Sequence, residues 1–105
     1  MTKGVVLLLS SPRDAFLSRV SNPRLRNIST QLFRRNARVG SGSAMDAFRF
    51  EQRTGILLSP SGHGLKLFER RSQLQRLRRE LSLFSADRQV VKELLIDIQN
   101  ALSGQ

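Results

Sequence analysis

A Gly-Ser-Gly-Ser run at residues 40–43 interrupts the hydrophobic pattern of this chain and divides it in two. Runs rich in glycine and serine behave as flexible linkers. Met45 follows closely, so the run fits either a surface loop or an engineered fusion junction. We therefore divide the chain into a basic segment 1–39, a linker 40–44 and a domain 45–105.

Length and composition limit the chain further. It has 105 residues, which is the size of one domain, and 39% of them are hydrophobic; adding the 7 glycines gives about 46%, an ordinary value for a globular protein. There is no cysteine. This absence excludes a disulfide framework, a thiol nucleophile and a thiolate metal site.

Before the linker, the pattern predicts one strand and two helices. Residues 5–9 form an apolar run with β-branched members, which favours a short buried strand and is too short for a signal peptide or a membrane span. Ser11-Pro12 and Asn22-Pro23 each combine a capping residue with proline at the first helical position. We expect helices over residues 12–20 and 23–38.

After the linker, two short apolar runs predict a β-hairpin. Phe48 and Phe50 alternate with charged residues, as in a half-buried strand. The runs 56–58 and 65–68 flank residues 59–64, which are rich in turn-forming serine, proline and glycine.

The pattern changes to a helical period from about Arg70. We expect a second helix to restart after Ser85 and to cover about 86–102, so that the two form an antiparallel αα-hairpin or meet at a sharp bend. The predicted fold class is α+β, dominated by helix, in the order strand, two helices, β-hairpin, αα-hairpin. A narrow apolar seam on the first of these C-terminal helices has spacings of 3, 4 and 3, and consists of Leu74, Leu77, Leu81 and Phe84.

Catalysis has few candidates in this sequence. His63 is the only histidine, and it lies between two glycines without an evident orienting partner. One histidine with scattered carboxylates does not make a metal site. We predict no enzyme activity, no catalytic residue, no metal site and no cofactor.

The charge points to a polyanionic partner. Lysine and arginine number 18 against 8 acids, a net charge of +10, and 15 of the cations are arginine. The arginine guanidinium matches phosphate geometry. The leading hypothesis is a nucleic-acid-binding or regulatory protein, with a solvated basic face as the alternative that needs no ligand. The predicted phosphate contacts are Arg24, Arg34, Arg35, Arg38, Arg70, Arg71, Arg76, Arg78 and Arg79.

Two other interpretations stay open. In one, the protein is a protein–protein interaction module in which 1–39 docks on 45–105, natural or as an engineered tethered complex. In the other, the arginine-rich and acid-poor start of the chain is an organelle presequence before a small mature domain. The predicted protein interface consists of Leu25, Ile28, Leu32, Phe33, Phe48 and Phe50.

The expected partners and location follow from these hypotheses. We expect nucleic acid or an acidic protein as the partner, with a homodimer as a further alternative, and no membrane. The expected location is intracellular, cytoplasmic or nuclear, with organelle targeting left open.

Overall fold

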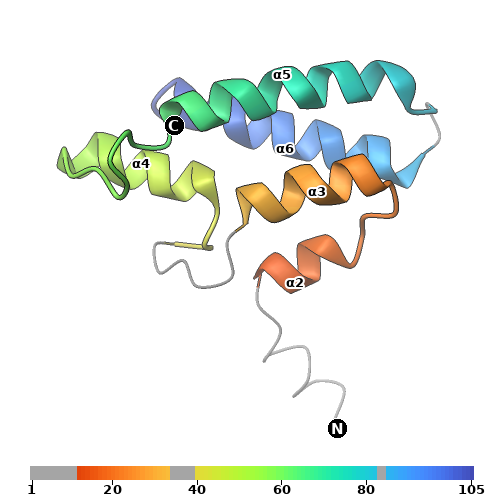
Figure 1. Ribbon diagram of the computed structural model, residues 1–105, viewed down its shortest axis with the longest axis horizontal. Coiled ribbons are helices and arrows are strands. Elements are labelled where there is room, and N and C mark those ends of the chain that lie inside the picture. The colour runs from red at the N-terminus through yellow and green to blue at the C-terminus, as the bar shows by residue number, and fades with distance from the viewer. Residues whose placement is uncertain (1–11, 34–39, 83–84) are drawn as a thin grey trace, which may run out of the picture.

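The regular structure of this protein is helical in a computed structural model that describes residues 12–33, 40–82 and 85–105 (Figure 1). Within these ranges there is no strand, and one isolated bridge joins Phe33 and Ser43. The helices are α2 (Pro12–Leu17), α3 (Pro23–Leu32), α4 (Ala44–Thr54), α5 (Gly64–Glu80) and α6 (Ala86–Leu102).

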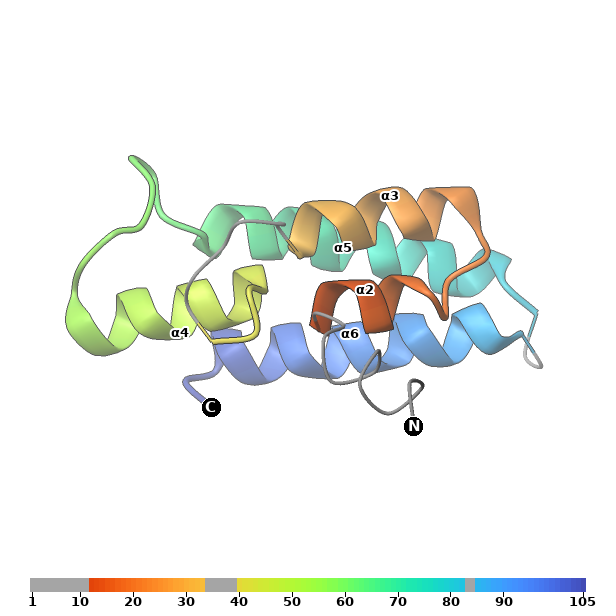
Figure 2. The same cartoon turned by 90° about the horizontal axis from the view of Figure 1, so that it is seen from below.

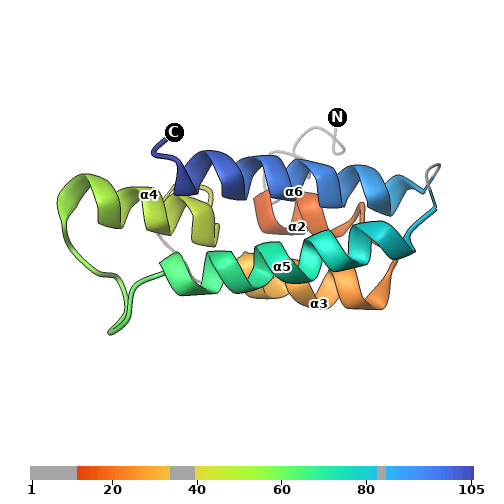
Figure 3. The ribbon, with the colours of Figure 1, turned by 90° about the horizontal axis from the view of Figure 1, so that it is seen from above.

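The two longest helices, α5 and α6, form the frame of the fold. They run antiparallel and lie side by side (Figures 1 and 3), which confirms the predicted αα-hairpin. Helix α3 packs on α5, α4 packs on both α5 and α6, and α2 packs on α3. The loop between α4 and α5 projects from this body (Figure 2).

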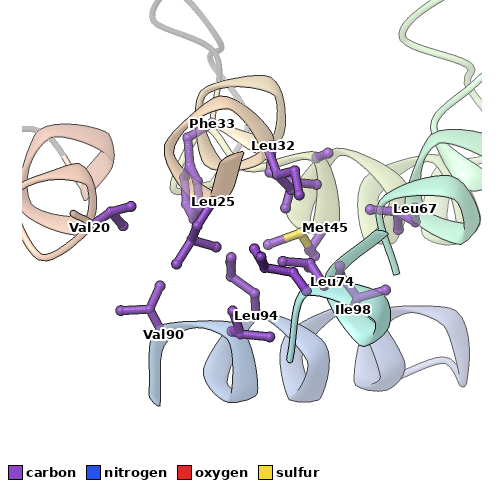
Figure 4. Close-up of a cluster of buried hydrophobic side chains, with 14 of the residues drawn as sticks. Val20, Leu25, Leu32, Phe33, Met45, Leu67, Leu74, Val90, Leu94 and Ile98 are labelled. Carbon is purple, nitrogen blue, oxygen red and sulfur yellow. The ribbon is translucent and has the colours of Figure 1, made fainter. Parts of the chain in front are cut away.

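One hydrophobic core joins these helices (Figure 4). It contains side chains from before and after the Gly-Ser run, so both parts of the chain contribute to the same interior. Its fully buried members include Leu25, Leu32, Met45, Leu67, Leu74, Leu94 and Ile98.

Side-chain caps begin α3, α4 and α6. The Asn22 side chain accepts hydrogen bonds from the backbone N–H groups of Arg24 and Leu25, at 2.9 and 3.1 Å, and Pro23 occupies the first helical position. This confirms the predicted start of α3. Ser85 caps α6 through the N–H of Asp87, at 3.1 Å, and α6 has the predicted bounds.

Two predicted helices are shorter than expected. Helix α2 ends at Leu17 instead of residue 20, and α3 ends at Leu32, where Phe33 takes an extended conformation. Residues 34–39, the rest of the predicted second helix, lie outside the described residues.

The predicted α+β class is wrong for the described chain, because the predicted β-hairpin does not form. Phe48 and Phe50 lie on α4, where both are partly buried. Ser43 caps this helix by accepting from Asp46 N at 3.0 Å, and Gly55, at φ 73°, ends it. These two end signals outweigh the alternation of only two phenylalanines, because capping fixes a helix where propensity is indifferent.

The second half of the predicted hairpin is also helical. Residues 65–68 open α5, since Leu67 falls seven residues before Leu74 and shares its buried face. Residues 56–58 form part of the loop, outside any helix. The strand predicted at 5–9 lies outside the described residues.

The Gly-Ser run makes defined contacts where sequence alone favours a flexible linker. The N–H and hydroxyl of Ser41 donate to Asp46 Oδ2 at 2.8 and 2.7 Å. Burial opposes the negative charge of Asp46, but the bonds from Ser41 and Arg49 outweigh it and lower the pKa of Asp46. Gly40 has a φ of +54°, and a Cβ there would lie 2.5 Å from Asp46 Oδ2. The run therefore forms an ordered connection into α4.

Candidate phosphate-binding surface

Helix α5 buries one narrow stripe, and the rest of its circumference is exposed or partly buried. Its buried residues are Leu67, Leu74 and Leu77, which fall on one side at 100° per residue. The remaining circumference carries five arginines. Two grooves flank this helix, one toward α3 and one toward α6.

The α3–α5 groove has a volume of about 450 Å³. Arg70 donates to Gln73 Oε1 at 3.0 Å in this groove, and Arg24 from α3 pairs with Glu80. Cations and amides therefore dominate its lining, which consists of Arg24, Asn27, Ile28, Gln31, Arg70, Gln73 and Arg76.

The α5–α6 groove has a volume of about 360 Å³ and a more apolar floor. Arg71 lies with its guanidinium carbon 5.0 Å from the centroid of the Phe68 ring and donates to Gln99 Oε1 at 3.1 Å. The lining consists of Arg71, Gln75, Arg78, Lys92, Leu95, Ile96, Gln99 and Asn100.

Most described arginines outside α5 bond to other parts of the fold; the exception is Arg53 on α4, which lies over the Phe50 ring and forms no ion pair among the described residues. Arg19 forms a two-pronged pair with Glu93 at 2.9 and 2.7 Å, and hydrogen bonding from Arg19 lowers the pKa of Glu93. Arg49 pairs with Asp97 at 2.6 Å and with Asp46 at 3.0 Å. Arg88 donates to carbonyl groups at the end of α5.

Arginines on α5 differ in this respect. Within residues 12–33, 40–82 and 85–105, no ion pair with a carboxylate forms at Arg70, Arg71, Arg76, Arg78 or Arg79. Their positive charge is therefore not neutralised by the described part of the fold.

The structure brings together part of the predicted phosphate-contact set. Arg24, Arg70 and Arg76 line the α3–α5 groove, whereas Arg71 and Arg78 line the α5–α6 groove. Arg79 is exposed on α5, and the predicted contacts Arg34, Arg35 and Arg38 lie outside the described residues.

Sequence reasoning missed Lys92 and the groove amides. Lys92 belongs to a helix of slightly acidic composition, and only the packing of α6 against α5 places it beside Arg71 and Arg78. Helical spacing predicts which residues share a face of one helix, but only the fold shows which helices lie side by side.

The six residues of the predicted protein interface are placed in and around the interior. Leu25, Ile28, Leu32 and Phe33 are buried core residues, and Phe48 packs against that core. Phe50 is partly buried under Arg53, whose guanidinium carbon lies 5.7 Å from the ring centroid.

His63 pairs with a buried carboxylate. Its Nδ1 lies 2.8 Å from Glu51 Oε2, and Glu51 also accepts from the backbone N–H groups of Leu58 and His63, both at 2.9 Å. Burial opposes the charge of Glu51, but these bonds outweigh it and lower the pKa of Glu51. Ser59 Oγ donates to the Gly62 carbonyl instead of to His63. The arrangement holds the α4–α5 loop in place.

Metal and membrane sites have no candidates among the described residues. No three histidine or acidic side chains there gather closely enough to hold a metal ion. No helix there combines the length and apolar character needed to cross a bilayer.

Comparison with protein-family models, curated proteins and solved structures found no match to this chain.

Proposed function

We propose that this protein binds nucleic acid by contacting phosphates through α5 and the adjoining faces of α3 and α6. The observation that carries this proposal is the set of five α5 arginines, which form no ion pair in the described part of the chain. By contrast, Arg19 and Arg49 of the same protein form ion pairs with carboxylates.

Unpaired arginines on one helix favour a polyanion on energetic grounds. Arg76 and Arg79 lie three residues apart, and a like-charge pair at that helical spacing destabilises a helix by about 0.2–0.5 kcal/mol. Phosphates relieve this repulsion and accept from the planar guanidinium fork. Each neutralised phosphate also releases a counterion.

A salt titration tests the proposal. Fluorescence anisotropy with a labelled 20-mer DNA duplex is measured from 50 to 200 mM NaCl. If about three to five phosphates are neutralised, log K falls against log salt with a slope of about −3 to −5. No binding at 50 mM NaCl, or a slope near zero, contradicts the proposal.

A double substitution locates the contact. Arg76→Gln with Arg78→Gln removes one cation from each groove, and we expect at least about tenfold weaker binding and a slope reduced by about 2. Arg53→Gln is the matched control, because Arg53 is an exposed arginine on α4. If the control reduces the slope and log K by half as much as the double variant, each lost charge counts alike, and overall charge, not α5, binds the duplex.

Protein association is the second candidate function. Ile56 and Leu57 are each 58% exposed, Leu58 is 42% exposed, and Leu65 and Phe68 are also exposed. Exposed apolar groups gathered in this way are typical of interaction sites. We propose a second copy of the chain as the partner. Sedimentation at about 100 µM would then show a dimer that Leu57→Ser abolishes, and a monomeric wild type removes this candidate.

A further inference from the structure

We infer that the nucleic acid is a B-form DNA duplex and that α5 lies in its major groove. This inference rests on the proposed function and specifies the form of its ligand. The juxtaposition that carries it is an exposed helix with cationic grooves on both sides.

Helix α5 forms a ridge on the molecule. Figure 1 shows it along one edge, and Figure 3 shows α6 on one side of it and α3 on the other. Exposed residues run from its first turn at Leu65 to its last at Glu80. A second macromolecule can therefore reach α5 along its whole length.

The cations flank the ridge instead of forming one stripe. Arg76 and Arg78 are two residues apart, so they project about 160° apart around the helix axis. Arg76 belongs to the α3–α5 groove, and Arg78 belongs to the α5–α6 groove with Lys92. Cations on both flanks match the two phosphate backbones that border a DNA groove.

The dimensions agree with this placement. An α-helix with side chains is about 10–12 Å across, and the major groove of B-DNA is about 12 Å wide. The 17 residues of α5 extend about 25 Å at 1.5 Å per residue, enough to follow the groove over several base pairs.

Other nucleic acids fit this surface less well. The major groove of an RNA duplex is deep and narrow, so a helix cannot enter it. Single strands are commonly held by successive aromatic platforms. Of the phenylalanines that the structure describes, Phe68 alone is in the exposed class, and Arg71 lies over its ring.

The outward stripe of α5 carries side chains suited to base edges. Ser72 and Arg79 are seven residues apart, so they project within about 20° of each other around the helix axis, and both are exposed. Arginine pairs with the O6 and N7 of guanine, and serine hydrogen-bonds to base edges with less selectivity. The flanking cations fix the position on the backbone, and this stripe meets the bases.

Four labelled probes of one sequence test the inference with the full chain at 100 mM NaCl. They are a 16-bp DNA duplex, the matching RNA duplex and the two DNA single strands. We expect the DNA duplex to bind at least about tenfold more tightly than each of the others. Methyl green, which occupies the major groove, should displace the protein, and netropsin, which occupies the minor groove, should not.

Arg79→Gln tests the proposed contact between Arg79 and the bases. It should weaken binding of the DNA duplex about 5- to 20-fold, whereas Arg53→Gln should change affinity less than about twofold. Circular dichroism checks that each variant is folded.

The outcomes separate this inference from the proposed function. Equal binding of the RNA duplex or a single strand, or displacement by netropsin, overturns the inference and leaves phosphate binding in place. Competition by polyglutamate as strong as that by DNA also overturns it and points to an acidic protein. Failure to bind any probe contradicts the proposed function itself.

Discussion

At the residue scale, two buried carboxylates hold connections between helices. Glu51 on α4 is 3% exposed and accepts from Leu58 and His63 in the following loop. Asp87 is 7% exposed and accepts from Ser21 and Asn22. Several hydrogen-bond donors thereby satisfy each of these buried carboxylates.

Glu51→Gln should lower the free energy of unfolding and make that free energy less dependent on pH in the acidic range. The pKa of Glu51 is lowered in the fold, so its contribution is present above the ordinary glutamate value of 4.5 and is lost as pH falls through the lower folded value. We expect urea unfolding at pH 7 to show a loss of about 1–3 kcal/mol. Between about pH 5 and 3, where ordinary carboxylates take up protons, the free energy of unfolding should fall less for the variant than for the wild type. Parallel pH curves for the two proteins would contradict this.

Gly40→Ala should destabilise the protein through a local clash. The residue has a φ of +54°, and its new Cβ would lie 2.5 Å from Asp46 Oδ2. Gly55→Ala is the control, because Gly55 has a φ of +73° with nothing within 4 Å of the added atom. We expect a loss of about 1 kcal/mol from conformation alone at Gly55 and a larger loss at Gly40, by thermal or urea unfolding. Equal losses would show that the contact with Asp46 relaxes freely.

At the element scale, α5 and α6 have different tasks. Helix α5 contributes three buried leucines and exposes Arg76, Arg78 and Arg79, while Arg70 and Arg71 are partly buried. Helix α6 buries more of its surface and anchors the α2–α3 connection through Asp87 at its N-terminus. The division leaves α5 free to meet a ligand while α6 stabilises the bundle.

Asp87→Ala should loosen the α2–α3 connection. It removes the acceptor of the Ser21 and Asn22 backbone N–H groups, both at 2.9 Å. We expect a loss of about 2–3 kcal/mol in the free energy of unfolding, and faster hydrogen exchange at Ser21 and Asn22. Glu69→Ala, at an exposed α5 position, serves as control and should change stability by less than about 0.5 kcal/mol. Unchanged exchange at both amides would contradict the assigned role of Asp87.

At the scale of the whole molecule, the core makes the helices interdependent. Leu25 and Leu32 from α3 are fully buried with Met45, Leu74 and Leu94. Removing α3 would therefore expose faces of α4, α5 and α6 together.

Leu25→Ala should lower the stability of every helix at once. The side chain is 0% exposed, so truncation leaves a cavity and costs about 2–5 kcal/mol. Urea unfolding followed by circular dichroism should remain a single transition at a lower midpoint. A two-step curve, with α5 and α6 surviving after α3 detaches, would show that residues 45–105 fold without the preceding segment.

The sequence revealed helices best where two independent signals coincided. Asn22 with Pro23, and Ser85 before a long apolar period, located the starts of α3 and α6 correctly. The strand predicted at Phe48 and Phe50 was wrong, because so short an alternation of apolar and charged residues fits a strand and a half-buried helix equally. Ser43 and Gly55 are the caps that decide between them.

Sequence alone determined the absence of cysteine, the arginine-rich charge and the helical start signals, because these depend on single residues and local spacing. The structure decided that Phe48, Phe50 and residues 65–68 belong to helices instead of strands, and that the Gly-Ser run forms a hydrogen-bonded entry into α4. It also decided which arginines lie beside carboxylates and which do not. The arginine pairing depends on contacts between residues up to 74 positions apart, such as Arg19 with Glu93, which no local pattern specifies.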